Sequence, residues 1–197
     1  MILKTNLFKI CHSDLQPKTG SLLISEPFLN EVYFQRSVIL LIEYQEEGSM
    51  GLVLNKPAGI VLNNMIDGLE QVEEIPIYCG GPIRHDRLFY LHTLGELIPG
   101  SVHLQGDLYI DGDFSTLLAY MRSGNQIEGR IRFFLGYAGW DQGQLMDEIR
   151  EDAWLVAEKR LPSLIEGEGD IYWQKTLLQQ ERKYHQWLNY PKEPYLN

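Results

Sequence analysis

The chain has 197 residues, enough for one compact domain with a sizeable core. Its hydrophobic share of 44% and charged share of 22% are ordinary for a globular protein and exclude an intrinsically disordered chain. The formal net charge of -10 argues against duplex DNA as a partner, because proteins neutralise the phosphate backbone with lysine and arginine.

Neither the cysteines nor the apolar runs indicate export. Cys11 and Cys79 are too few for a disulfide framework, so we expect two reduced thiols. The N-terminal segment lacks the apolar stretch of a signal peptide. The longest apolar run, Val38–Ile42, is far shorter than the ~20 residues of a membrane-spanning helix. These features predict a cytoplasmic protein that does not bind membranes.

The first third of the chain has the pattern of strands. Ser21–Ser25 is predicted as a short strand. The continuous Val, Ile and Leu residues of Arg36–Tyr44 predict a strand buried on both faces. Met50–Lys56 is predicted to return beside it, across a five-residue loop, as the second strand of a hairpin. A short helix is expected at Ile60–Met65.

Short strands and one helix follow. Strands are predicted at Ile75–Cys79, Leu88–Thr93 and Ser101–Gln105. In the third of these, Val102 is expected to face inward. Asp113 is expected to cap a helix whose apolar residues recur at helical spacing, and Gly124 fits the position just after its end.

The segment Arg130–Trp154 predicts a strand, a glycine turn and a helix. Arg130–Leu135 is aromatic and apolar, as a strand inside a sheet should be. Gly136 and Gly139 indicate a tight turn. Asp141, with Gln144 three residues later, is typical of a capping box at a helix start.

The end of the chain predicts one more strand and a long helix. The strand is expected at Trp154–Ala157 and the amphipathic helix at Asp170–Leu188. The expected organisation is an extended segment over 1–19, a domain over 20–160, a helical region over 161–190 packed on that domain, and a tail over 191–197. The elements do not alternate regularly, which favours an α+β fold over a doubly wound sheet.

Several motifs together resemble one protein family. The central motif is Arg132-Phe-Phe-Leu-Gly-Tyr-Ala-Gly-Trp140, followed by Gly143-Gln144-Leu145 and Glu148. The others are Leu23-Ile-Ser25-x-Pro27, Phe34-x-Arg36-Ser37-Val-Ile-Leu40, Gly51-Leu-Val-Leu-Asn55-Lys-Pro57, and Gly80-Gly81-Pro82 with Leu91-His92. This pattern resembles the YqgE/AlgH family of bacterial proteins over about residues 20–158. It departs at Met146, where the family usually carries a glutamate.

The resemblance carries expectations about fold and function. It implies a single α+β domain with a branched, mixed or antiparallel sheet, part of it closed as a small barrel, surrounded by helices. It implies no established activity. Some family members carry a transcription-regulator label, so the resemblance also implies a candidate transcriptional regulator.

Motifs for catalysis and metal binding are sparse. The sequence has no Gly-x-Ser-x-Gly elbow, no P-loop and no His-Glu-x-x-His. No two of the five histidines have metal-ligand spacing, so we expect no metal and no cofactor. Cys79 precedes a glycine pair and could act as a nucleophile, but an inert, small apolar side chain is the favoured interpretation because no base can be assigned to it.

Polar residues gather at predicted strand ends, where concave sites often form. The ligand-binding candidates are Ser25, Arg36, Ser37, Asn55, Lys56 and His92, with the turn residues Gly80 and Gly81. Arg36 begins a buried strand, so its guanidinium must find a partner. That partner is either a structural carboxylate, with Glu148 as one candidate, or the carboxylate or other anion of a ligand.

The glycine turn and the helix after it predict a structural hub. Its residues are Gly136, Tyr137, Gly139, Trp140, Asp141, Gln144 and Glu148. Gln144 and Glu148 share one helix stripe and are expected to support the loop before the helix. The alternative is an anion site at the helix N-terminus, which Asp141 would disfavour by taking the free N–H groups and repelling phosphate.

Three classes of function remain after the sequence is considered. The leading one is a non-catalytic cytoplasmic protein that binds a small molecule or a protein, with a regulatory role as one version. The alternative is a hydrolase or transferase that uses a polar cluster around Arg36, Asn55 and His92. Direct DNA binding ranks last because of the net charge.

Overall fold

The computed structural model describes residues 15–29, 31, 33–157, 165 and 167–192. Its strands are β1 Leu22–Ser25, β2 Val38–Tyr44, β3 Gly48–Val53, β4 Pro57–Val61, β5 Pro76–Cys79, β6 Ile83–His92, β7 Val102–Gln105, β8 Leu108–Ile110, β9 Ile131–Asp141 and β10 Trp154–Ala157. Its α-helices are α1 Phe114–Arg122, α2 Gln144–Arg150 and α3 Gly169–Leu178. Short 3-10 helices are η1 Leu62–Asn64, η2 Gly95–Leu97 and η3 Arg182–Asn189.

All ten strands belong to one branched sheet. The main path runs β10-β1-β2-β3-β9-β6-β8-β7, and β4 and β5 leave it as a branch. The pairings are antiparallel except that β5 runs parallel to β9. The α+β class and the branched, mixed sheet are therefore confirmed. The path of the described strands is open, so the small closed barrel that the resemblance implied is not confirmed.

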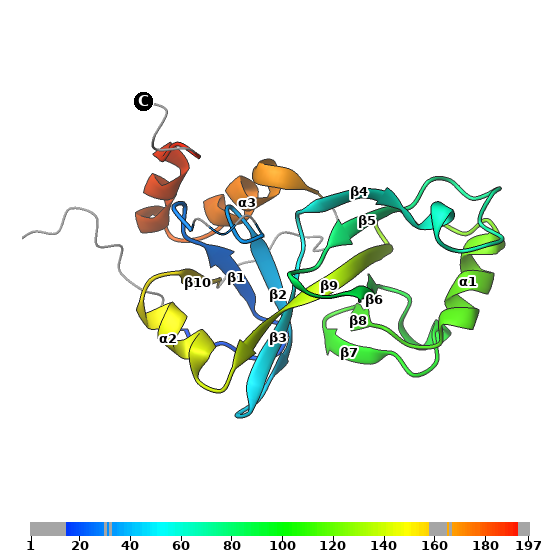
Figure 1. The fold of residues 1–197 in the computed structure, drawn as a ribbon, viewed down its shortest axis with the longest axis horizontal. Coiled ribbons are helices and arrows are strands. Elements are labelled where there is room, and N and C mark those ends of the chain that lie inside the picture. The colour runs from blue at the N-terminus through cyan, green and yellow to red at the C-terminus, as the bar shows by residue number, and fades with distance from the viewer. Residues whose placement is uncertain (1–14, 30, 32, 158–164, 166, 193–197) are drawn as a thin grey trace, which may run out of the picture.

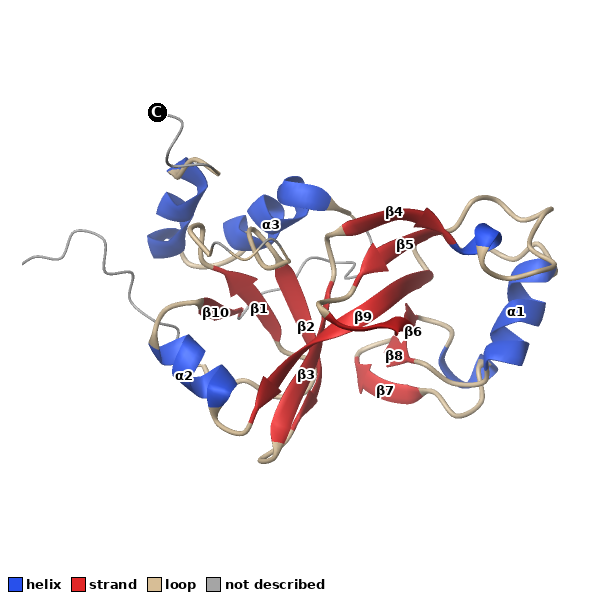
Figure 2. Ribbon diagram, in the orientation of Figure 1, coloured by secondary structure: helices blue, strands red, loops and turns tan. Residues whose placement is uncertain are grey.

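β9 is the strand that joins the two halves of the molecule. Its first half pairs with β5 and β6, and its last residues pair with β3. Figure 1 shows β9 crossing the centre, with α1 at one end and α2 and α3 at the other. Figure 2 shows the helices lying around the strands rather than between them.

Three apolar clusters form the core. The α3 cluster packs α3 and η3 on one face of β1 and β2 and includes Trp173, Leu177 and Trp187. The α1 cluster lies below α1 and includes Met121 and Phe133. A third group, the α2 cluster, joins α2 to the opposite face of β1 and β2 and contains Trp140, Leu145, Ile149 and Trp154. Because β1 and β2 are covered on both faces, Leu22–Ile24 and Val38–Ile42 are apolar without interruption.

The predicted strand, turn and helix after Arg130 need correction. β9 continues without a turn to Asp141, and Gly136 with its φ of +71° lies within it. The pairing with β6 shifts register across this glycine, so it marks a bulge. Asp141 is not the helix cap; that position is taken by Gly143, with a φ of +77° and no side-chain cap bond among the described residues.

The predicted C-terminal helix is also divided. α3 ends at Leu178, and η3 begins at Arg182 in a different helical form. The break lets both Tyr184 and Trp187 reach the α3 cluster, because residues three apart lie on the same side of a 3-10 helix. Tertiary burial here outweighs the helical pattern of the sequence.

The cap of α1, the position of Pro57 and the exposure of Val102 are further features of the fold. Asp113 caps α1 as expected, and its Oδ1 accepts a hydrogen bond from the Thr116 N–H at 2.7 Å. Pro57 begins strand β4, directly after the predicted hairpin. Val102 was expected to face inward but is 59% exposed. No helix among the described residues has the length and apolar character needed to cross a membrane.

Candidate functional site

Asn55 lies at the centre of the predicted polar cluster and ties three segments together. Its Oδ1 accepts from the Val38 N–H at 2.9 Å. Its Nδ2 donates to the carbonyls of Arg36 at 2.9 Å and Gly169 at 2.8 Å. The side chain is fully buried, and its amide is therefore used by the fold.

The two predicted serines are also occupied. The Ser25 hydroxyl accepts from the Ser37 N–H at 2.9 Å, and the Ser37 hydroxyl donates to the Phe34 carbonyl at 2.9 Å. The Trp173 indole N–H donates to the Ser25 carbonyl at 3.0 Å. Both serines are buried, so they connect β1 to the turn before β2.

Arg36 is paired, but not with Glu148. Its backbone has a φ of +50°, unusual for a side chain with a Cβ. Nη1 donates to the Asp170 carboxylate at 3.3 Å, and Nη2 donates to the Tyr190 carbonyl at 2.7 Å. The guanidinium also lies over the Trp173 ring, 5.4 Å from its centre. The candidate pair with Glu148 was therefore wrong.

Lys56 lies beside this network. Its Nζ donates to the Gln35 carbonyl at 2.5 Å. Burial is the main factor that lowers the pKa of Lys56, the nearby Asp170 carboxylate opposes that shift, and the positive charges of Lys192 and Arg36 add to it. Three positive side chains are thus close enough to influence one another.

The structure does not bring His92 to Arg36 and Asn55. His92 lies opposite Ile131 on the α1 side of the sheet, whereas its neighbour Leu91 faces the α3 cluster. Its Nδ1 accepts from the Leu94 N–H at 3.2 Å, and its Nε2 lies 3.1 Å from the Asp111 carbonyl. Burial lowers the pKa of His92, which matches a neutral ring with one donor and one acceptor. The polar cluster expected around all three residues does not form.

Gly80 and Gly81 lie between β5 and β6, where the chain passes very close to β9. A Cβ on Gly80 would lie 2.2 Å from the Gly136 carbonyl oxygen, and one on Gly81 would lie 2.2 Å from the Tyr137 backbone. No side chain fits there without backbone movement. Packing against the bulge of β9 therefore explains this glycine pair without a ligand.

Two of the predicted hub residues, Trp140 and Gln144, contact a third, Glu148, and Trp154 joins them. Its Oε2 accepts from the indole N–H groups of Trp140 at 2.8 Å and Trp154 at 2.7 Å. Its Oε1 accepts from the Gln144 amide at 2.8 Å. The Gln144 side chain also accepts from the Asp141 N–H at 3.0 Å. This is one of the two hydrogen bonds of a capping box, although Asp141 is not the N-cap residue. One carboxylate thus joins α2 to β9 and β10.

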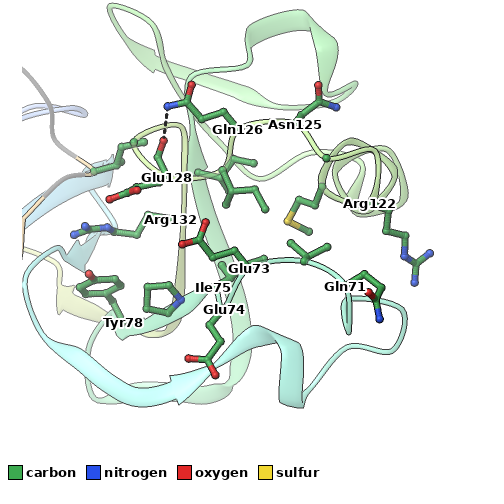
Figure 3. A pocket seen from close by; sticks show the side chains of 18 of the residues that line it. Gln71, Glu73, Glu74, Ile75, Tyr78, Arg122, Asn125, Gln126, Glu128 and Arg132 are labelled. Atoms are coloured by element: carbon green, nitrogen blue, oxygen red, sulfur yellow. Dashed lines mark hydrogen bonds between the residues drawn. The ribbon is translucent and has the colours of Figure 1, made fainter.

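Sequence reasoning missed a large cavity, of about 1030 Å³, which lies between the segment before β5 and the segment after α1. Figure 3 shows the side chains that surround it. Its lining includes Gln71, Val72, Glu73, Glu74, Ile75, Tyr78, Met121, Arg122, Asn125, Gln126, Ile127, Glu128, Ile131, Arg132, Ile165 and Glu168.

Three polar side chains meet at one end of this cavity. The Arg132 guanidinium lies over the Tyr78 ring, 3.9 Å from its centre, and donates to the carbonyls of Leu54 at 3.0 Å and Gly167 at 2.8 Å. The Tyr78 hydroxyl donates to the Glu168 carboxylate at 3.1 Å. Burial raises the pKa of Tyr78, so the phenol stays neutral and remains a donor.

The rest of the cavity has an apolar floor and several charged side chains in its lining. Ile75, Met121 and Ile131 form part of the floor and belong to the α1 cluster. Figure 3 shows Glu73 pointing toward the interior and Arg122 pointing away from it. The Arg122 guanidinium instead donates to the carbonyls of Gly68 and Asp67.

The sequence contained little that could reveal this cavity. Glu70–Glu74 has the composition of a solvated acidic loop, and Arg132 has the place of an ordinary strand residue. The two walls lie about fifty residues apart in the chain, and tertiary contacts, including the parallel pairing of β5 with β9, bring them together. Among the described residues, no group of three or more His, Cys, Asp or Glu side chains could hold a metal ion.

Comparison with known proteins places the chain in a family. A family model described as AlgH-like matches residues 22–194. A UPF0301 protein of Parabacteroides distasonis is 46% identical over 193 residues, with 98% of each chain covered. A UPF0301 protein of Bacteroides fragilis is 45% identical over 197 residues, with 100% of each chain covered. The names of these relatives state neither an activity nor a ligand.

Solved structures support the same assignment. The solution structure of AlgH from Pseudomonas aeruginosa has a TM-score of 0.61 at 31% identity, covering 77% of this chain and 82% of that one. A crystal structure of a Corynebacterium diphtheriae protein has a TM-score of 0.76 and covers 94% of this chain and 98% of that one. At 22% identity, this second match shows a shared fold alone. By its sequence and its fold, the chain belongs to the AlgH-like family.

Proposed function

We propose that this protein is a non-catalytic binding protein whose ligand is a small organic molecule held in the cavity between β5 and α1. One observation carries the proposal. A cavity of about 1030 Å³ combines an apolar floor with three polar side chains that converge at one end. Small-molecule sites in proteins have this combination of size, apolar lining and few polar groups.

The lining indicates the kind of ligand. Ile75, Met121 and Ile131 offer apolar surface to a hydrocarbon or aromatic body. Tyr78, Arg132 and Glu168 offer hydrogen-bonding groups that would orient a polar end of the molecule. A molecule with both parts would satisfy both ends of the cavity.

Binding is favoured over catalysis by the chemistry of the same lining. The described residues around the cavity include no Ser, Cys or His, so nucleophile-and-base pairs of the common hydrolases have no counterpart there. The enzymatic alternative required Arg36, Asn55 and His92 in one place. The first two are joined to each other, and the third lies on the other face of the sheet.

A methyl-labelled NMR screen tests the proposal. The probes are aryl and alkyl fragments that carry an amine, alcohol or carboxylate, each at millimolar concentration. We expect a subset of fragments to shift the methyl signals of Ile75, Met121 and Ile131, with Ile24 and Ile39 as buried controls away from the cavity. If fragments of all three kinds leave the cavity methyls unchanged, or shift the control methyls instead, the proposal is wrong.

A further inference from the structure

A second group of charged residues lies outside this cavity, beside the first turn of α3. We call it the Arg36 cluster, and it consists of Arg36, Lys56, Asp170 and Lys192. The Asp170 carboxylate is 3.3 Å from Arg36 Nη1 and 3.2 Å from Lys192 Nζ. The three positive charges exceed the one negative charge by two, although the whole chain has a net charge of -10. The cluster is therefore positive within an acidic protein.

The guanidinium of Arg36 is incompletely satisfied. The residue is only 9% exposed, and its buried Nε has no hydrogen-bond partner among the described residues. A buried N–H of a charged group without an acceptor is unfavourable, because it loses its hydration without replacement. An acceptor oxygen that reached this edge of the guanidinium would remove that penalty.

The start of α3 lies beside the cluster and supplies its one carboxylate, Asp170. Glu168 occupies the N-cap position but makes no side-chain cap bond within the described part of the chain. The first N–H groups of a helix have no partner inside the helix and attract negative charge, but that of Gly169 already donates to the Asn55 carbonyl at 2.7 Å. Asp170 lies in this first turn and already holds Arg36 and Lys192 there.

The segment Tyr190–Lys192 supplies a neutral oxygen to the cluster. The Tyr190 carbonyl accepts from Arg36 Nη2 at 2.7 Å. The segment is also held by Gln35 Nε2, which donates to the Lys192 carbonyl at 2.9 Å, and by the ring of Phe28, whose centre is 4.8 Å from that of Tyr190. Tyr190 also packs against the α3 cluster, whereas Pro191 and Lys192 are exposed. Freeing Arg36 Nη2 therefore requires a local shift of the Tyr190 carbonyl and not release of the segment.

We propose that the Arg36 cluster is a binding site for a small oxyanion, a phosphate or carboxylate group, which replaces the Tyr190 carbonyl on Arg36 and lies between Arg36, Lys56 and Lys192. The anion would offset the excess of positive charge and provide an acceptor for Nε. Burial is the main factor that lowers the pKa of Lys56, and the positive charges of Lys192 and Arg36 add to that shift, which agrees with this arrangement. Arg36, Lys56 and Lys192 are not among the residues that line the cavity, so this site does not depend on the proposed function.

Titration with inorganic phosphate at constant ionic strength tests the site. The readout is the ¹⁵N resonance of Arg36 Nε, which should shift as its N–H gains an acceptor, with a dissociation constant on the order of 1 mM. Lys56→Met should weaken binding roughly tenfold, as expected for the loss of one charge-assisted contact. Lys192→Met should weaken it by a similar factor. Acetate, titrated in the same way, shows whether a carboxylate group is also accepted.

Arg87→Met is the matched control, because Arg87 is an exposed cation 3.9 Å from the Asp111 carboxylate in another part of the fold. It should leave the phosphate affinity unchanged within twofold. Arg36 itself is kept, since its removal would disturb the folded chain. The proposal is overturned if neither anion shifts the Arg36 Nε resonance, or if Lys56→Met and Lys192→Met bind phosphate as tightly as Arg87→Met does.

Discussion

Gly136 and Gly139 both lie in β9, but their surroundings differ. Gly136 has a φ of +71°, and a Cβ there would lie 2.6 Å from the Gly81 carbonyl oxygen. Gly139 has no such backbone angle, and a Cβ there would meet the tip of the Ile83 side chain, which can move. We expect Gly136→Ala to lower the free energy of unfolding by at least ~2 kcal/mol, and Gly139→Ala by less than ~1 kcal/mol. Urea unfolding measures both, and equal losses would contradict the bulge assigned to Gly136.

Asp113 caps a helix, whereas Asp141 has only the sequence pattern of a cap. Asp113 accepts from the Thr116 N–H, whereas Asp141 is the last residue of β9 and its side chain caps nothing among the described residues. Asp113→Ala should cost ~0.5–2 kcal/mol of stability, as a lost cap does. Asp141→Ala should stay within ~0.5 kcal/mol of the parent. The urea midpoints of the two variants measure both losses of stability. A larger loss for Asp141→Ala than for Asp113→Ala would show that Asp141 does cap the helix.

His92 should make stability depend on pH. Burial lowers its pKa in the folded state below the ordinary value of about 6.5. The neutral ring therefore contributes stability that is complete above that value and is lost as the pH falls through the lower, folded pKa. His92→Gln keeps a donor and an acceptor but does not titrate. On acidification from about pH 7.5 to 5.5, the wild type should lose more stability than this variant. Parallel losses would show that His92 does not titrate in this range.

At the scale of elements, α2 depends on one carboxylate. Glu148 accepts from two indoles and one amide, whereas Asp147 on the same helix pairs with Arg150 in solvent. Glu148→Gln replaces an acceptor oxygen with a donor that faces the Gln144 amide, so we expect a loss of ~1.5–3 kcal/mol. Asp147→Asn removes the same charge and should cost less than ~1 kcal/mol. If the two variants unfold at the same urea concentration, Glu148 is not the link between α2, β9 and β10.

Elements with a strong local pattern could be predicted from the sequence. The apolar runs gave β1, β2 and β10, and the capping signals gave α1, because burial and hydrogen bonding act there within a few residues. The path of β9 through Gly136 could not be predicted. A glycine with positive φ can make either a turn or a bulge, and the neighbouring strand β6 decides between them.

At the scale of the whole molecule, strand order and register decide which of the predicted polar residues lie together. The sequence singled out Arg36 and Asn55, and the structure joins them by a hydrogen bond. It could not separate His92 from them, because the face that His92 occupies follows from the register of β6 on β9. The cavity was missed for the same reason, since its two walls meet through long-range contacts such as the parallel pairing of β5 with β9.

The net charge carries a prediction about nucleic acid. With 27 acidic and 17 basic residues, the chain should not bind duplex DNA at physiological salt. Its positive Arg36 cluster contains too few cations to track a phosphate backbone. A mobility-shift titration at ~0.15 M salt should show no complex at micromolar protein, while sub-micromolar binding would contradict the charge argument.

The most direct test of the proposed binding function blocks the cavity. Gln126 lies on its wall, whereas Gln186 is exposed on η3 in another part of the molecule. A fragment that shifts the methyls of Ile75 and Ile131 is titrated against the wild type, Gln126→Trp and Gln186→Trp. We predict at least a tenfold weaker affinity, about 1.4 kcal/mol, for Gln126→Trp and less than a twofold change for Gln186→Trp. Equal affinity for all three proteins would contradict the assignment of the ligand to this cavity.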